Sequence, residues 1–178
     1  MVDRLTRGIL RADGALLNRC SRSKPPRTVR LFIVACSRGG DGWLWWSAGL
    51  LVLSFGGTDR LQAFSAAFLS ACSAVLLFAR LKVHIRRPRP HGPHRWARIA
   101  APDQFSFPSG HSMTAFAVCS ALFDFYPHWW PILLVIAVAV ATSRVILGLH
   151  YLTDVLAGAV IGSALGAIWS ELLRGAGA

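Results

Sequence analysis

Five apolar runs dominate this sequence and restrict the folds that it can adopt. They cover residues 43–57, 61–81, 112–126, 129–147 and 151–173. A bilayer core is about 30 Å thick, and roughly 20 apolar residues in a helix cross it. The first run is somewhat short by this measure, but tryptophans gather at the run ends, where amphipathic rings favour the membrane interface. A soluble all-helical core is the alternative, although five such runs leave no polar outer face.

We therefore expect an all-α fold, in which residues 43–178 form a polytopic membrane bundle of about five transmembrane helices. The composition agrees, since charged residues make up 15% of the chain, against about a quarter in soluble domains. The formal net charge is nevertheless +11. Such an excess predicts an anionic partner, namely a phosphate, an anionic lipid surface or a nucleic acid.

Residues 1–42 differ from the rest of the chain. The first 40 residues hold nine Lys and Arg residues, with Leu5, Ile9, Leu16 and Leu17 interleaved among them. No apolar stretch of signal-peptide length follows these charges, so the segment is not a secretory signal. We expect a basic amphipathic segment that lies on anionic lipid headgroups. A solvated basic tail is the alternative.

A first polar cluster follows the second apolar run. Residues 82–90 read Lys-Val-His-Ile-Arg-Arg-Pro-Arg-Pro. Lys82 and Arg89 offer hydrogen-bond donors and fixed charge to phosphate oxygens, and the two prolines end the preceding helix. Basic residues that mark the end of a membrane span have the same composition, so this cluster alone does not distinguish a phosphate site from the end of a span.

A second cluster, Pro108-Ser109-Gly110-His111, precedes the third apolar run. Ser109 is a natural N-cap residue, and Gly110 lets the backbone approach a ligand closely. The N–H groups of the first helical turn suit a phosphate, because they point outward at the positive end of the helix. Since Ser and Gly begin many helices, the pattern is weak in isolation.

A third cluster joins the fourth and fifth runs and contains Arg144, His150 and Asp154. A charge such as Arg144 at the end of an apolar run is costly unless it has a partner. His150 and Asp154 stand at i and i+4, so we expect them on one helix face. The carboxylate would accept the Nδ1–H of the imidazole and leave Nε2 free to attack. The alternative is an interfacial histidine with an aspartate that caps the helix.

Together the clusters are far more specific than any one of them. They read Lys-x6-Arg-Pro, Pro-Ser-Gly-His and Ser-Arg-x5-His-x3-Asp, and all are expected on one face of the bundle. This pattern resembles the three-part signature of the type 2 phosphatidic acid phosphatase superfamily at every position. The resemblance covers residues 82–154 by motif, and the five-span layout is similar to the shorter bacterial lipid phosphatases of that superfamily. Residues 1–40 carry none of the signature.

The resemblance implies a lipid phosphatase with a phosphohistidine intermediate. His150 is then the nucleophile, and Asp154 orients it. His111 protonates the leaving group and afterwards acts as base on water.

The resemblance also implies a phosphate clamp, formed by Lys82, Arg89 and Arg144 and completed by Ser109 and the amide of Gly110. The clamp stabilises charge on the equatorial phosphate oxygens, so neither a metal nor another cofactor is implied. The remaining histidines fit no metal-binding spacing; they are His84, His91, His94 and His128.

A catalytic site at the membrane surface predicts an amphiphilic substrate, such as a polyprenyl diphosphate, phosphatidylglycerol phosphate or phosphatidic acid. We expect a multi-pass protein of the bacterial inner membrane. The similarity to undecaprenyl diphosphate phosphatases favours an outward-facing site, whereas the basic N-terminal segment favours the cytoplasmic side.

Two rival functions share these residues. A haloperoxidase can hold vanadate in the same pocket, but those relatives are larger and soluble. A non-catalytic lipid-binding or transport protein does not need the complete set of His111, His150 and Asp154. Nucleic-acid binding would explain the charge, but no recognisable nucleic-acid-binding module is present.

Overall fold

The computed structural model describes residues 2–22, 25–90 and 103–175, and the regular secondary structure in these ranges is entirely helical. The helices are α1 (Val2–Arg22), α2 (Arg27–Gly39), α3 (Trp43–Phe55), α4 (Arg60–Ile85), α5 (Gly110–Phe123), α6 (Trp130–Ile146) and α7 (Leu152–Gly175), with a short 3-10 turn, η1 (Gly57–Asp59), before α4. The expected all-α class is confirmed.

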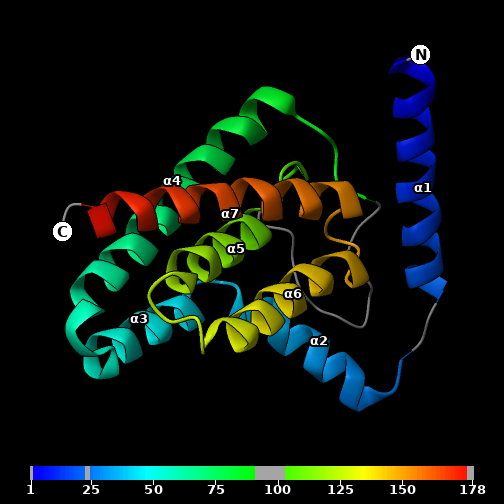
Figure 1. The fold of residues 1–178 in the computed structure, drawn as a ribbon. Helices are drawn as coiled ribbons and strands as arrows, with labels where there is room; N and C mark the ends of the chain where they lie inside the picture. The colour runs from blue at the N-terminus through cyan, green and yellow to red at the C-terminus, as the bar shows by residue number, and fades with distance from the viewer. Residues whose placement is uncertain (1, 23–24, 91–102, 176–178) are drawn as a thin grey trace.

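Helix α5 lies at the centre of the bundle and packs against α4, α6 and α7 (Figure 1). Helix α3 packs on α4, and α2 packs on α6. Helix α1 stands at one side, beside the N-terminal end of α7, and α7 ends at the opposite side (Figure 1).

Helices α3 to α7 coincide with the five apolar runs of the sequence, but they differ in length. Within the described residues, two helical stretches are long and apolar enough to cross a membrane, Gly57–Ile85 and Leu152–Gly175. Helices α3, α5 and α6 have 13, 14 and 17 residues. A helix rises about 1.5 Å per residue, so α3 spans roughly 20 Å. Helix length alone therefore does not establish five crossings.

The basic N-terminal segment folds as α1 and α2, and both helices contribute buried residues to the bundle. Ile33 of α2 packs with Leu147 and Leu149, which precede α7. Asp13 of α1 and Ser37 of α2 are also buried. The segment therefore packs against the helices that follow it.

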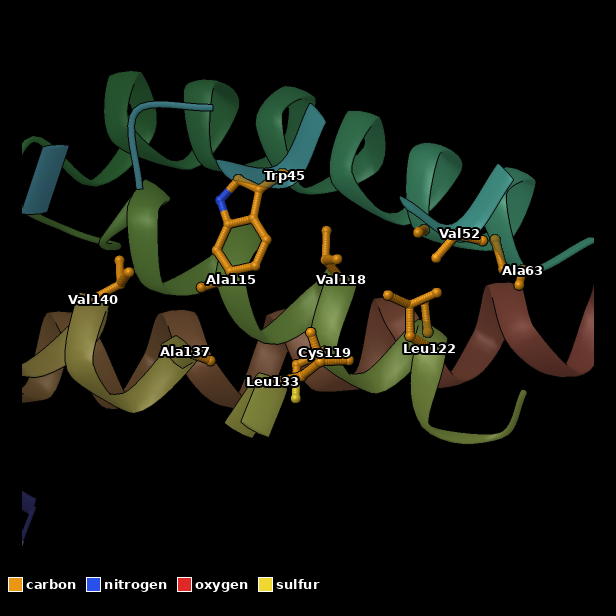
Figure 2. Close-up of a cluster of buried hydrophobic side chains, with 13 residues drawn as sticks. Trp45, Val52, Ala63, Ala115, Val118, Cys119, Leu122, Leu133, Ala137 and Val140 are labelled. Atoms are coloured by element: carbon orange, nitrogen blue, oxygen red, sulfur yellow. The ribbon is translucent and has the colours of Figure 1, made fainter. Parts of the chain in front are cut away.

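The main hydrophobic core lies between α3, α4, α5 and α6 (Figure 2). Small residues occupy much of it, which lets the helices approach closely. Figure 2 shows side chains from these helices meeting around the central helix; the labelled ones are Trp45, Val52, Ala63, Ala115, Val118, Cys119, Leu122, Leu133, Ala137 and Val140.

The backbones of α5 and α7 touch along a row of glycines. Gly158, Gly162 and Gly166 recur every fourth residue on the α7 face that meets α5. A Cβ atom on Gly162 would lie 2.1 Å from the carbonyl oxygen of Met113. Near the first residues of the two helices, the Ser109 N–H donates to the Asp154 backbone carbonyl at 3.0 Å. The contact fixes the start of α5 against the start of α7.

The segments that leave α4 and enter α5 are also joined. Helix α4 ends where Arg86 adopts a left-handed conformation with φ of 52°, and the prolines that follow prevent its continuation. Pro88 forms an isolated antiparallel bridge with Phe105, and the Ser106 N–H donates to the Arg87 carbonyl at 2.8 Å. The first and second sequence clusters are thereby held side by side.

Candidate active site

His150 occupies the connection between α6 and α7 and is almost fully buried. Its Nδ1 lies 2.7 Å from the Ser106 carbonyl oxygen, and its Nε2 lies 3.1 Å from Nη1 of Arg89. A carbonyl only accepts and a guanidinium only donates, so Nδ1 carries the proton and Nε2 presents its lone pair. This is the tautomer that a nucleophilic Nε2 requires.

Burial lowers the pKa of His150 from 6.5 to about 4. The positive charges of Arg89 and Arg144 act in the same direction, whereas Asp154 opposes them. The imidazole is consequently neutral at physiological pH, which keeps its lone pair available.

Asp154 does not accept the hydrogen bond that the i, i+4 spacing predicted. Its Oδ2 lies 3.8 Å from Nδ1 of His150, beyond hydrogen-bond distance, and the Ser106 carbonyl accepts that proton instead. The fully buried Asp154 carboxylate accepts from the Tyr151 N–H at 2.9 Å and from Nη1 of Arg87 at 2.6 Å. Its negative charge remains beside the imidazole, but it does not hold the ring directly.

Arg87 links Asp154 to the N-terminal helix. Its Nη2 donates to Oδ2 of Asp13 at 2.9 Å, while its guanidinium lies over the ring of Tyr151. Oδ1 of Asp13 also accepts from the backbone N–H of Thr153 at 3.2 Å. Helix α1 therefore supplies one wall of the polar network behind the imidazole.

Lys82 and Arg89 converge on one carboxylate. Nζ of Lys82 lies 2.5 Å from Oδ2 of Asp103, and Nη2 of Arg89 lies 2.9 Å from Oδ1. Burial raises the pKa of Asp103, but the hydrogen bonds from the two cations outweigh it and leave the pKa below its ordinary value. Two donors that bind both oxygens of a carboxylate have the spacing needed to bind two oxygens of a phosphate.

Arg144 is buried at the end of α6. Nη1 donates to the hydroxyl of Ser37 at 2.5 Å, and its Nε–H finds no acceptor among the described residues. A buried, unsatisfied donor on a cation is costly. An anionic ligand in this position would satisfy it.

Ser109 and Gly110 begin α5 as the sequence predicted. The Ser109 hydroxyl caps the helix by accepting from the Ser112 N–H at 3.5 Å, and Ser109 is fully buried. A Cβ on Gly110 would lie 3.0 Å from the ring of Phe78. The glycine therefore makes room for a neighbouring side chain, and its expected role beside a ligand stays a prediction.

His111 follows directly and contacts the turn between α2 and α3, where its Nε2 lies 2.7 Å from Oδ1 of Asp41. The Ser109 contact with Asp154 ties the helix that carries His111 to the helix that follows His150. All three sequence clusters thus meet at one end of the bundle.

The carboxylates of Asp13, Asp41 and Asp103 and the carbonyl of Ser106 complete the site, and sequence reasoning missed all four. No motif includes them, and each is distant in sequence from the group that it contacts. Of the other histidines, His91 and His94 lie outside the described residues.

A family model described as the PAP2 superfamily matches residues 62–176. The chain belongs to the PAP2 superfamily. A decaprenylphosphoryl-5-phosphoribose phosphatase of Mycobacterium tuberculosis strain H37Rv is 31% identical over 173 residues, which cover 94% of this chain and 92% of that protein. The family resemblance seen in the motifs is thereby confirmed.

A sequence match and a solved structure from Bacillus subtilis extend the comparison. Phosphatidylglycerophosphatase B is 38% identical over 125 residues, covering 64% of this chain and 52% of that protein. The crystal structure of a transmembrane PAP2 type phosphatidylglycerolphosphate phosphatase superposes with a TM-score of 0.71 at 28% identity, covering 94% of this chain and 85% of the other. The chain is accordingly a membrane-associated phosphatase of the PAP2 superfamily.

Proposed function

We propose that this protein hydrolyses the phosphate ester or diphosphate of an amphiphilic lipid through a phosphohistidine at His150. The observation that carries the proposal is the state of the buried imidazole. Its Nδ1–H is committed to the Ser106 carbonyl, and its Nε2 faces the clamp residue Arg89. A neutral nucleophile beside fixed cations suits attack on an anionic phosphorus.

In the first step, the Nε2 lone pair forms a bond to phosphorus while the bond to the leaving oxygen breaks. His111 gives that oxygen a proton. In the second step, water attacks phosphorus, the N–P bond breaks, and His111 takes the proton of the water. Each step moves one phosphoryl group between in-line partners.

The cations stabilise the charge of the phosphoryl group during both steps. Lys82 and Arg89 exchange Asp103 for two phosphate oxygens. The Nε–H of Arg144, which has no acceptor among the described residues, binds another oxygen. Ser109 and the Gly110 amide complete the clamp at the start of α5. Because these groups supply the positive charge, the reaction requires no metal ion.

Asp154 acts through its charge. The imidazole becomes positive when it bonds to phosphorus, and a buried carboxylate 3.8 Å from Nδ1 stabilises that cation. Arg87 and the Tyr151 N–H keep the carboxylate in place.

The substrate is a lipid because apolar surface begins next to the site. A cavity of about 430 Å³ lies between α3, α4 and α5, and Gly42 and Thr114 line it close to Asp41 and His111. Aromatic and aliphatic side chains make up most of its lining, among them Trp45, Phe64, Phe68 and Leu76. A phosphate held by the clamp can place its acyl or prenyl chain in this cavity.

We further propose that α3 to α7 cross the bacterial inner membrane as five spans. The apolar residues that flank the shorter helices complete their spans. The basic helices α1 and α2 lie at the headgroup level, where they bind anionic lipid. Positive residues near membrane spans are retained in the cytoplasm, so the charge of this segment favours a cytoplasmic site.

Phosphate release by the purified protein tests this function. The substrates are a polyprenyl diphosphate, phosphatidylglycerol phosphate, phosphatidic acid, a decaprenyl-linked phosphoribose and a soluble phosphate ester, each with and without EDTA. We expect one or more lipids to exceed the soluble ester, with no loss in EDTA. Preference for the soluble ester, or halide oxidation on added vanadate, would overturn the proposal.

Variants test the residue roles. His150→Ala should abolish both phosphate release and an acid-labile phosphoenzyme, whereas His128→Ala removes an exposed imidazole far from the clusters and serves as the control. Asp154→Asn should slow turnover by about 100-fold or more. A His150→Ala protein that turns over normally contradicts the nucleophile assignment.

A further inference from the structure

The turn between α2 and α3 packs directly against the imidazole of His111. Oδ1 of Asp41 lies 2.7 Å from Nε2 of the imidazole. A Cβ on Gly40 would lie 2.7 Å from Cδ2 of the same ring, so a larger residue there would collide with it. Asp41 itself is held by its backbone N–H, which donates to the Arg38 carbonyl at 3.0 Å. The Nε2 and Cδ2 atoms of the ring therefore lie against the connection between α2 and α3, and Nδ1 points away from it.

The charges around His111 are mostly positive. Arg144 on α6 and Lys82 on α4 both face the imidazole, and Asp41 is the acidic group acting on it among the described residues. Burial of the ring and then the nearby cations disfavour its protonated form, while a carboxylate at hydrogen-bond distance favours it. A general acid has to hold its proton at the working pH. Asp41 is placed to offset the clamp that surrounds the acid.

We propose that Asp41 is the positioning residue of the general acid–base His111. The inference deepens the proposed phosphatase function and rests on it. Asp41 accepts the Nε2–H, which fixes the ring and leaves Nδ1 to exchange protons with the reacting groups.

The proton balance follows from this arrangement. The Nδ1–H of the imidazolium passes to the leaving oxygen as the P–O bond breaks, and the neutral ring then takes a proton from the attacking water at the same atom. Asp41 remains ionised throughout, as does the carboxylate of a Ser-His-Asp triad.

The first test measures kcat/KM against pH, because this ratio covers the steps up to phosphoenzyme formation. Asp41→Asn should lower the maximum by about tenfold and move the alkaline limb, which requires protonated His111, about one unit towards acid. Asp41→Glu keeps the carboxylate and should restore most of the alkaline limb. Asp59→Asn removes the same charge from η1 on an exposed side chain and should reproduce the wild-type profile.

The second test needs no turnover. Histidine-labelled protein in detergent micelles is titrated by NMR, and the His111 signal is assigned by its loss in His111→Gln. The midpoint of His111 should fall by about one unit in Asp41→Asn and stay unchanged in Asp59→Asn. Equal midpoints in the two variants overturn the role of Asp41. Absence of phosphate release by the wild-type protein refutes the phosphatase function separately, since the titration still decides the pairing.

Discussion

Replacing Gly162 with alanine should push apart α5 and α7, the two helices next to the candidate active site. The added Cβ would lie 2.1 Å from the Met113 carbonyl oxygen, whereas ordinary contact begins at 3.4 Å. A backbone carbonyl cannot rotate away, so α5 and α7 have to move apart by roughly 1 Å. This seam holds His111, on α5, in place relative to His150, just before α7.

The magnitude follows from two opposing effects. Overpacking costs about 1–3 kcal/mol, and a clash with backbone belongs at the upper end, while alanine recovers about 1 kcal/mol through its helix propensity. A net loss of about 2 kcal/mol corresponds to a fall in Tm of about 4–8 °C for a chain of this size. Because a misplacement of about 1 Å can cost 100-fold in rate, we expect turnover to suffer more than folding.

Thermal unfolding in detergent and phosphate release from a lipid substrate measure the two effects. Gly175→Ala is the matched control, because it makes the same change in the same helix where a Cβ would meet nothing within 4 Å. If Gly162→Ala kept both the Tm and the turnover of Gly175→Ala, the close backbone contact would have no energetic or catalytic importance.

Two further predictions concern buried ionisable groups. Asp13→Ala removes the acceptor of Arg87 and of the Thr153 N–H, so it should lower the free energy of unfolding by about 1–3 kcal/mol and reduce phosphate release. Asp3→Ala, near the start of α1, is the control. Equal Tm and activity in the two variants would contradict the link from α1 to the site. The pKa of His150 falls from 6.5 unfolded to about 4 folded, so the unfolded state binds more protons between these values and stability decreases as pH falls through this window. The Tm of His150→Gln should consequently depend less on pH between 6.5 and 4 than that of the wild type, and parallel curves would refute the assignment.

Local sequence patterns predicted the helices well. Each apolar run became a helix because hydrophobicity and helical propensity act over neighbouring residues. Ser109 caps α5, and prolines follow the end of α4, as their local chemistry dictates. The lengths of α3, α5 and α6 were less predictable, because apolar residues at the run ends lie in turns as well as in helices.

The failed hydrogen bond between His150 and Asp154 shows where local rules end. The i, i+4 rule applies to residues within one helix, but α7 begins at Leu152, after His150. The geometry of α7 therefore does not set the position of the imidazole. Its Nδ1–H donates a hydrogen bond to the Ser106 carbonyl, which the connection before α5 brings alongside.

The sequence by itself determined the all-α class, the helical segments and the make-up of the three clusters, since these depend on composition and short spacings. The tertiary structure decided which groups surround them. Asp13, Asp41 and Asp103 come from three separate segments, and each contacts a cluster residue. Such pairings depend on how the helices pack, because hydrogen bonds and ion pairs act over a few ångströms in space whatever the separation along the chain.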